Sequence, residues 1–221
     1  MKLLNRYIDH TLLKPNATKQ DIIKLCDEAK EHHFYSVCIN SSYVALAKAQ
    51  LKNCEVKICT VVGFPLGAAS THAKVEETKQ ALSDGADEID MVINVGFLKS
   101  KDFDAVWKDI EAVKQQLPNN ILKVILETCL LDEFEIIKAS ELAIQSGADF
   151  IKTSTGFGTG GATINDVKLM KSVCKDCLKI KASGGIRDQK TALAYINLGV
   201  SRLGTSSGIA IIKGKQSNST Y

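Results

Sequence analysis

The sequence is short of the features that divide a chain or anchor it in a membrane. Only three of its 221 residues are proline, and no Ser/Gly-rich linker or block of like charge interrupts it. We therefore expect one domain over residues 1–212 and a polar, disordered tail over residues 213–221. No apolar run approaches the ~20 residues of a membrane span. The opening Met1-Lys2-Leu3-Leu4 is not followed by the apolar stretch of a signal peptide, which predicts a cytoplasmic protein.

The chain also lacks an excess of charge of either sign. Its 28 Lys and Arg against 25 Asp and Glu give a net charge of +3, which argues against nucleic-acid binding and a membrane-binding patch. The four histidines share no metal-ligand spacing, so we expect no metal and no cofactor. The seven cysteines are odd in number and irregularly spaced, which predicts free thiols in packing positions rather than a disulfide framework.

What the sequence does contain is a regular alternation of short apolar runs with amphipathic stretches, which is typical of repeated β-α units. The expected strands cover residues 7–11, 36–40, 57–62, 88–95, 122–128, 150–154, 179–183 and 201–204. Eight units of roughly 28 residues each predict an α/β fold, a compact single-domain (β/α)₈ barrel of the TIM type.

Alternate residues of these strands differ sharply in polarity. One set is almost entirely branched and apolar: Ile8, Val37, Ile39, Ile58, Ile89, Met91, Ile93, Val124, Leu126, Ile151 and Ile180. The other set is polar or charged: Asp9, Cys38, Asn40, Asp90, Asn94, Glu127, Lys152, Ser154, Lys181 and Ser183. Both faces of an open parallel sheet lie under helices and are apolar, whereas a closed barrel has one face turned to its lumen. The pattern favours the barrel.

Two lysines in the polar set carry the chemical hypothesis. Lys152 and Lys181 fall on neighbouring expected strands, which lie ~4.8 Å apart in a sheet. A nearby cation and burial both lower the pKa of a lysine, and a neutral amine attacks a carbonyl to form a Schiff base. Asp90 is placed to relay protons. These residues suit a cofactor-free class I aldolase; the structural alternative is an ion network that merely fills the lumen.

Glycine-rich segments follow the last two strands, where barrels of this type bind phosphate. Ser183-Gly184-Gly185 follows the seventh strand and Gly204-Thr-Ser-Ser-Gly208 the eighth. Their backbone N–H groups, the hydroxyls of Ser206 and Ser207, and a short helix starting near Ser207 suit a dianion. We expect Thr155-Gly156 to close the same pocket. The alternative is that these glycines only form tight turns.

Seven motifs, in this order along the chain, resemble those of the deoxyribose-phosphate aldolase family. They are Asp9-His-Thr-Leu-Leu-Lys-Pro15, Thr60-Val-Val-Gly-Phe-Pro-Leu-Gly67, Glu88-Ile-Asp-Met-Val-Ile-Asn-Val-Gly96, Leu122-Lys-Val-Ile-Leu-Glu-Thr128, Phe150-Ile-Lys-Thr-Ser-Thr-Gly-Phe157, Lys181-Ala-Ser-Gly-Gly-Ile-Arg187 and Gly204-Thr-Ser-Ser207. The resemblance extends from about residue 5 to about residue 212. It implies reversible cleavage of 2-deoxy-D-ribose 5-phosphate to D-glyceraldehyde 3-phosphate and acetaldehyde.

The resemblance also implies a role for each matching residue. Lys152 is the expected Schiff-base lysine, Lys181 the lysine that perturbs it, and Asp90 the proton donor and acceptor. The expected substrate contacts are Asp9, Cys38, Thr155, Gly156, Gly184, Gly185, Gly204, Ser206 and Ser207. Some relatives carry a basic residue where Phe157 stands here, which leaves Arg187 as the candidate charge for the phosphate. The family usually dimerises, so a homodimer is expected.

Two other functions stay open on the residues alone. A related Schiff-base barrel acts on another phosphorylated sugar or on a dihydroxyacetone-type donor, and a non-catalytic sensor binds a sugar phosphate without turnover. An intact set of Lys152, Lys181 and Asp90 argues against the sensor, because a binder needs no desolvated amine. For Tyr221, at the end of the tail, we expect disorder rather than a lid over the barrel.

Overall fold

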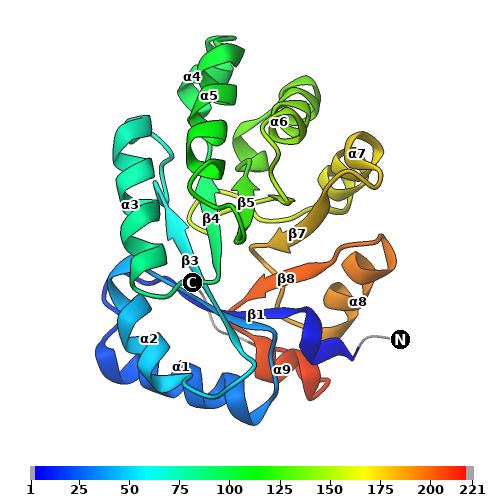
Figure 1. The fold of residues 1–221 in the computed structure, drawn as a ribbon. Coiled ribbons are helices and arrows are strands. Elements are labelled where there is room, and N and C mark those ends of the chain that lie inside the picture. The colour runs from blue at the N-terminus through cyan, green and yellow to red at the C-terminus, as the bar shows by residue number, and fades with distance from the viewer. Residues whose placement is uncertain (1–2, 218–221) are drawn as a thin grey trace.

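Eight parallel strands form a closed barrel in chain order, and the last strand pairs with the first (Figure 1). The structure is a computed structural model that describes residues 3–217. Its strands are β1 (Ile8–Leu12), β2 (Ser36–Ile39), β3 (Lys57–Val62), β4 (Glu88–Val92), β5 (Ile121–Ile125), β6 (Phe150–Lys152), β7 (Lys179–Ser183) and β8 (Arg202–Thr205). The predicted (β/α)₈ architecture is confirmed.

Helices surround the barrel, as Figure 1 shows. The α-helices are α1 (Lys19–Glu31), α2 (Val44–Gln50), α3 (Thr71–Ser83), α4 (Val95–Lys99), α5 (Phe103–Lys114), α6 (Glu133–Gln145), α7 (Ile164–Cys174), α8 (Gln189–Asn197) and α9 (Gly208–Ile212). Short 3₁₀ turns are η1 (Leu4–Tyr7), η2 (Ser41–Tyr43) and η3 (Thr128–Leu130). None of the helices within residues 3–217 combines the length and apolar character that crossing a membrane requires.

The apolar strand residues pack under these helices. Ile8, Val37, Ile89, Val124 and Ile151 are completely buried and belong to one continuous hydrophobic core. Side chains that alternate along a strand point to opposite faces, so the polar set turns to the lumen instead. The packing of the helices thus fixes which residues face the centre of the barrel.

Several strands end earlier than predicted, and two polar residues of the predicted lumen set lie beyond the strand ends. After β4, the Asn94 side chain accepts a hydrogen bond from the Phe97 N–H and caps α4. The Asn40 side chain donates to the Leu13 carbonyl at 3.3 Å. Asn40 and Asn94 thus lie just beyond the ends of β2 and β4, where each side chain bonds a backbone group.

The segment after α9 stays close to the barrel as far as residue 217. The Lys215 N–H donates to the Ala210 carbonyl, and the Ser217 N–H donates to the Arg187 carbonyl at 3.0 Å. The described part of the tail therefore lies against the loop after β7. Residues 218–221, and with them the prediction made for Tyr221, lie outside the described residues.

Candidate active site

The lumen holds seven charged side chains contributed by six strands, which we call the lumen cluster. Three are carboxylates and four are cations, and all are buried. The members of the lumen cluster are Asp9, Glu88, Asp90, Lys123, Lys152, Lys181 and Arg202. Buried charges are costly unless they pair, so the arrangement of their contacts decides what the cluster can do.

Asp90 lies at the centre of the lumen cluster. Its Oδ2 is 2.9 Å from Lys152 Nζ and 2.7 Å from Lys181 Nζ. Its Oδ1 accepts from Lys123 Nζ at 2.8 Å and from the Cys59 thiol at 3.1 Å. Lys152 and Lys181 are direct register partners on β6 and β7, so the predicted proximity of the two lysines is confirmed.

A second set of contacts ties the remaining carboxylates to the cations. Asp9 Oδ2 lies 2.6 Å from Lys181 Nζ, and Asp9 Oδ1 accepts from Arg202 Nε at 2.6 Å. Glu88 Oε2 lies 2.6 Å from Lys123 Nζ and 2.7 Å from Arg202 Nη2. Lys123, Lys181 and Arg202 therefore each contact two carboxylates. Within residues 3–217, Lys152 contacts only Asp90.

The electrostatics of Lys181 correct one prediction. Burial alone lowers the pKa of Lys181, but the carboxylates of Asp9 and Asp90 outweigh burial and hold this pKa well above its usual range. Burial raises the pKa of Asp90, and the opposing charges of Lys123, Lys152 and Lys181 outweigh that effect and hold it well below its usual range. The expectation that neighbouring lysines approach neutrality is thus wrong for Lys181, because the sequence does not show two carboxylates around one ammonium.

Two thiols on neighbouring strands complete the lumen beside Asp90. Cys38 and Cys59 are register partners on β2 and β3. A hydrogen bond from Cys59 lowers the pKa of Cys38 to about 7, with burial opposing this and Lys181 adding to it. Burial and the Cys38 partner raise the pKa of Cys59. The predicted position of Cys38 beside the catalytic candidates is therefore confirmed.

Some lumen atoms are spaced as metal ligands are. The ligand atoms of Cys38, Cys59 and Asp90 lie within 4.8 Å of one another, and so do those of Asp9, Cys59 and Glu88. The Lys123 ammonium contacts Cys59 Sγ at 3.3 Å and, as described, Asp90 and Glu88. A protein cation thus contacts two of the three donors in each set.

Four lumen residues were not predicted from the sequence: Glu88, Lys123, Arg202 and Cys59. For Glu88, Lys123 and Cys59 the signal was present, since each has the parity of a residue assigned to the lumen or is next to one assigned outward. No residue of the expected strand 201–204 was assigned to a face. Glu88 and Lys123 precede Asp90 and Glu127 by two and four positions. Applying the period-2 pattern along the whole of the expected strands 57–62, 88–95 and 122–128 finds these three.

The two predicted phosphate loops do meet. A small cavity lies between them and is lined by Gly185, Ile186, Arg187, Gly204, Thr205, Ser206 and Ser207. Gly184 and Gly185 have φ of +84° and +79°, which a residue with a side chain rarely adopts. The Ser207 N–H donates to Thr205 Oγ1 at 2.9 Å, and α9 begins directly after Ser207.

Thr155 and Gly156 lie in a different loop, which follows β6, and are not part of that cavity lining. Glu127 accepts hydrogen bonds from the Thr155 N–H at 3.2 Å and from its hydroxyl. The next side chain, Phe157, packs edge-on against Phe64 at 5.3 Å between ring centroids. Glu127 therefore anchors this loop rather than joining the lumen cluster.

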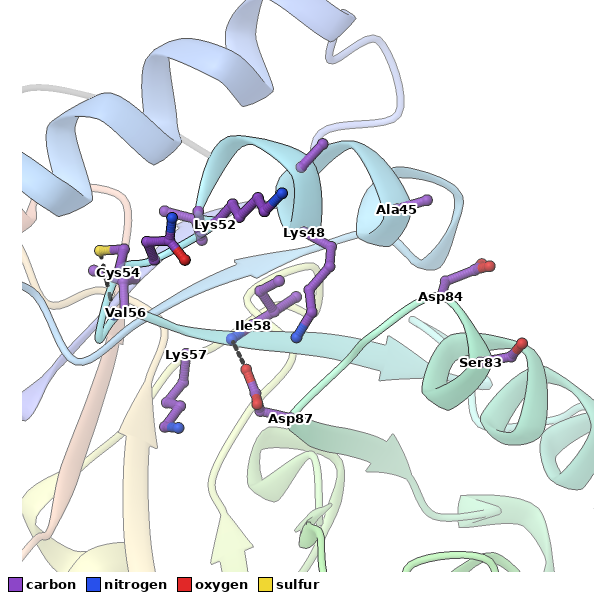
Figure 2. A pocket seen from close by; sticks show the side chains of 13 residues that line it. Ala45, Lys48, Lys52, Cys54, Val56, Lys57, Ile58, Ser83, Asp84 and Asp87 are labelled. Carbon is purple, nitrogen blue, oxygen red and sulfur yellow. Dashed lines mark hydrogen bonds between the residues drawn. The ribbon is translucent and has the colours of Figure 1, made fainter.

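A larger cavity, of about 700 Å³, lies away from the lumen cluster and from the loops after β7 and β8 (Figure 2). It opens between α2, the start of β3 and the turn from α3 to β4, where Lys48, Lys57 and Asp87 line it. Asp87 is engaged there by the Ile58 N–H at 2.8 Å. Catalytic groups of this fold lie at the carboxyl ends of the strands, so the cavity at the start of β3 is not the candidate site.

Comparison with known proteins agrees with this geometry. The family model described as DeoC/LacD family aldolase matches residues 4–213. The chain is 58% identical over 211 residues to the deoxyribose-phosphate aldolase of Finegoldia magna, covering 96% of this chain and 99% of that protein.

Solved structures give the same result. One titled "QR15, an Aldolase" has a TM-score of 0.92 and 44% identity and covers 96% of both chains. The deoxyribose phosphate aldolase from Aeropyrum pernix, described as a unique tetrameric structure, has a TM-score of 0.87 and 32% identity, covering 95% of this chain and 89% of that one. The chain, with its paired lumen lysines at the centre of a (β/α)₈ barrel, belongs to the DeoC/LacD family of aldolases.

Proposed function

We propose that this aldolase reversibly cleaves 2-deoxy-D-ribose 5-phosphate to D-glyceraldehyde 3-phosphate and acetaldehyde through a Schiff base on Lys152. One observation carries the choice of lysine. Lys123 and Lys181 each contact two carboxylates, whereas Lys152 pairs with no carboxylate of residues 3–217 other than Asp90, at 2.9 Å. Lys152 therefore loses the least ion pairing when its ammonium gives up a proton. It is also the last residue of β6, at the catalytic end of the barrel.

The proposed chemistry follows from a neutral amine at that position. Lys152 Nζ attacks the C1 aldehyde of the open-chain sugar, and loss of water leaves a protonated imine that withdraws electrons from the C2–C3 bond. Cleavage releases D-glyceraldehyde 3-phosphate and leaves an enamine. Protonation of the enamine at C2 and hydrolysis of the imine then release acetaldehyde and regenerate the amine.

Asp90 and Lys181 are the proposed proton donor and acceptor. They lie 2.7 Å apart, and Asp90 also reaches Lys152. The carboxylates around Lys181 outweigh burial and hold its pKa well above its usual range, and the cations around Asp90 outweigh burial and hold its pKa well below. Before substrate binds, a protonated Lys181 thus faces an ionised Asp90 beside the reacting amine. Asp9 and Cys38, both buried in the lumen, complete the proposed wall of the sugar site.

The substrate phosphate is proposed to bind at the loops after β7 and β8. These loops carry backbone N–H groups and the hydroxyls of Ser206 and Ser207, and Arg187, which lines the same cavity, is the proposed source of positive charge. The proposed phosphate contacts are Gly184, Gly185, Gly204, Ser206 and Ser207. Thr155 and Gly156 directly follow β6 and are proposed to contact the sugar at the same end of the barrel.

Borohydride trapping tests the mechanism. Acetaldehyde and borohydride are expected to leave one ethyl group on the wild-type chain, and peptide mapping is expected to place it on Lys152. The Lys152→Met variant is expected to show neither trapping nor turnover of 2-deoxy-D-ribose 5-phosphate. Trapping on another lysine overturns the assignment. Turnover of dihydroxyacetone-type donors without acetaldehyde condensation assigns a different substrate, and tight sugar-phosphate binding without turnover excludes catalysis.

We also propose that the chain forms a homodimer, as the family resemblance implies. A related aldolase is described as tetrameric, which supports self-association in this family without fixing the number of subunits. Light scattering coupled to size-exclusion chromatography is expected to give twice the mass of the chain, and the mass of one chain contradicts the proposal.

A further inference from the structure

Arg202 contacts two carboxylates of the lumen cluster, those of Asp9 and Glu88. Unlike the lysines of the cluster, it does so with the several nitrogens of a planar guanidinium. It is the first residue of β8 and is 2% exposed. Its guanidinium contacts Asp9 through Nε at 2.6 Å and Nη2 at 2.5 Å. It contacts Glu88 through Nη1 at 3.1 Å and Nη2 at 2.7 Å. Two nitrogens bind the two oxygens of Glu88 and fix the orientation of that carboxylate. Nε and Nη2 both hold one oxygen of Asp9, Oδ1, which leaves Oδ2 to other partners.

The guanidinium is also held by an aromatic ring on one of its faces and by a hydroxyl. Arg202 stacks on the Tyr35 ring, with its central carbon 3.5 Å from the ring centroid, and Nη2 donates to the Ser36 hydroxyl at 3.3 Å. Arg202 and Tyr35 also line a cavity of about 370 Å³, together with Lys179. Arg202 therefore lies between this cavity and the carboxylates of the lumen cluster.

The contacts of Asp9 connect Arg202 to the proposed reaction. With Oδ1 held by Arg202, Asp9 presents Oδ2 to Lys181 at 2.6 Å. Lys181 then bridges to Asp90 at 2.7 Å, which reaches Lys152 at 2.9 Å. Arg202 touches neither Lys152 nor Asp90 in any of these contacts. Its influence on the reacting amine passes through Asp9 and Lys181.

We propose that Arg202 is a positioning residue of the aldolase reaction, which orients Asp9 so that Lys181 stays between Asp9 and Asp90. This inference rests on the proposed function, in which Lys181 and Asp90 exchange protons with the intermediates on Lys152. A lysine at position 202 keeps the charge but not the fork, so it holds Asp9 through one nitrogen only. The role thus depends on the shape of the side chain in addition to its charge.

The Arg202→Ala and Arg202→Lys variants test this role. We expect kcat to fall about 10²-fold in Arg202→Ala, because misplaced catalytic groups cost that order of rate, and by less in Arg202→Lys. We also expect the acidic limb of the kcat–pH profile to move to higher pH in Arg202→Ala and by a smaller amount in Arg202→Lys, which keeps the positive charge but holds Asp9 through one nitrogen only. Burial raises the pKa of Asp9 and Arg202 is the strongest influence that lowers it, so loss of the guanidinium lets Asp9 take up a proton at a higher pH.

The cavity under Arg202 provides a second readout. Added methylguanidinium is expected to enter it and restore kcat in Arg202→Ala, whereas ethylammonium, a cation without the fork, is expected to restore less. Lys179→Met is the matched control: Lys179 lines the same cavity but belongs to β7 outside the lumen cluster. We expect it to keep the wild-type kcat and pH profile.

The outcomes separate this inference from the proposed function. Failure of borohydride trapping in the wild type refutes the Schiff base itself. Normal trapping in the wild type, combined with an unchanged acidic limb and unchanged kcat in folded Arg202→Lys, refutes only the positioning role. If Arg202→Ala does not fold, Arg202→Lys decides alone, with its kcat and pH profile measured on protein whose circular dichroism matches the wild type.

Discussion

Two groups of buried charges lie on opposite sides of the barrel wall, and they differ in how completely they are paired. Outside the wall, Lys74 on α3 and Asp109 on α5 form a single ion pair with 2.5 Å between Nζ and Oδ2. Lys74 also donates to the Val92 carbonyl at 2.9 Å, and Asp109 accepts from the Thr71 hydroxyl at 2.8 Å. One cation thus meets one carboxylate, and neutral groups satisfy the remaining contacts.

Inside the wall, the lumen cluster places four cations around three carboxylates. Three of these cations contact two carboxylates each, and Lys152 contacts one. The resulting shifts in lysine pKa differ in sign. Burial lowers the pKa of Lys74 despite Asp109, whereas two carboxylates raise the pKa of Lys181 despite burial. The single ion pair outside the wall links α3 to α5. Inside the wall, the uneven sharing of carboxylates leaves Lys152 with one carboxylate partner, which makes its amine the one available for reaction.

The largest expected difference concerns turnover. The Asp90→Asn variant removes the acceptor shared by Lys123, Lys152 and Lys181, and we expect kcat to fall roughly 10³-fold, the order of a lost acid–base group. Steady-state cleavage of 2-deoxy-D-ribose 5-phosphate measures the effect. A kcat within tenfold of the wild type contradicts the central role of Asp90.

The next effect concerns stability. The Asp109→Asn variant leaves the buried Lys74 ammonium without its carboxylate, and we expect a loss of about 3 kcal/mol or more in the free energy of unfolding. Urea titration measures it, and kcat per folded molecule is expected to stay at the wild-type value. The Lys74→Met/Asp109→Leu double variant is expected to recover most of the loss. A fall in kcat shows that the pair outside the wall also shapes the site.

The smallest effect is a dependence of stability on acid. The folded protein holds the pKa of Asp90 and of Glu88 below their usual values, because their cation partners outweigh burial. Groups with a lowered folded pKa stabilise the fold above their unfolded pKa, near 4. That stability is lost as the pH falls further, towards the folded pKa values. Urea titrations from pH 7 to pH 3 are expected to show a declining free energy of unfolding below about pH 4.

The same titration separates the two groups of charges. The acid decline is expected to persist in Asp109→Asn and to become shallower in Asp90→Asn, which has one titrating lumen carboxylate fewer. Equal slopes in both variants show that the acid sensitivity arises elsewhere in the protein.

The strands and the lumen lysines were predictable because strand periodicity is local. Lys152 and Lys181 each stand at an inward position of a short apolar run, and neighbouring strands of a barrel bring such positions together. The ends of the strands were not predictable from the same pattern. Glu127 adopts a φ of +57°, and its hydrogen bonds to Thr155 are made to another loop that the local sequence does not reveal.

Arg202 shows a second limit of prediction from the sequence. It falls in an expected strand, but its partners were not predictable: Arg202 and Asp9 are 193 positions apart and meet only because the barrel closes between β8 and β1. The position of Thr155 relative to the phosphate loops is a similar case. Which loop borders which cavity depends on how loops pack across the barrel end, and a single sequence contains no measure of that packing.

By itself, the sequence determined the barrel, the two inward lysines and the glycine-rich loops after the last two strands, because alternation along a strand and turn chemistry act over a few residues. Only the tertiary structure decided how the charges are shared. The number of carboxylates around each cation depends on strand register and barrel closure, which place Asp9 and Asp90 on either side of Lys181. That sharing leaves Lys152 with the fewest partners, since electrostatic pairing depends on distance in space and not on distance along the chain.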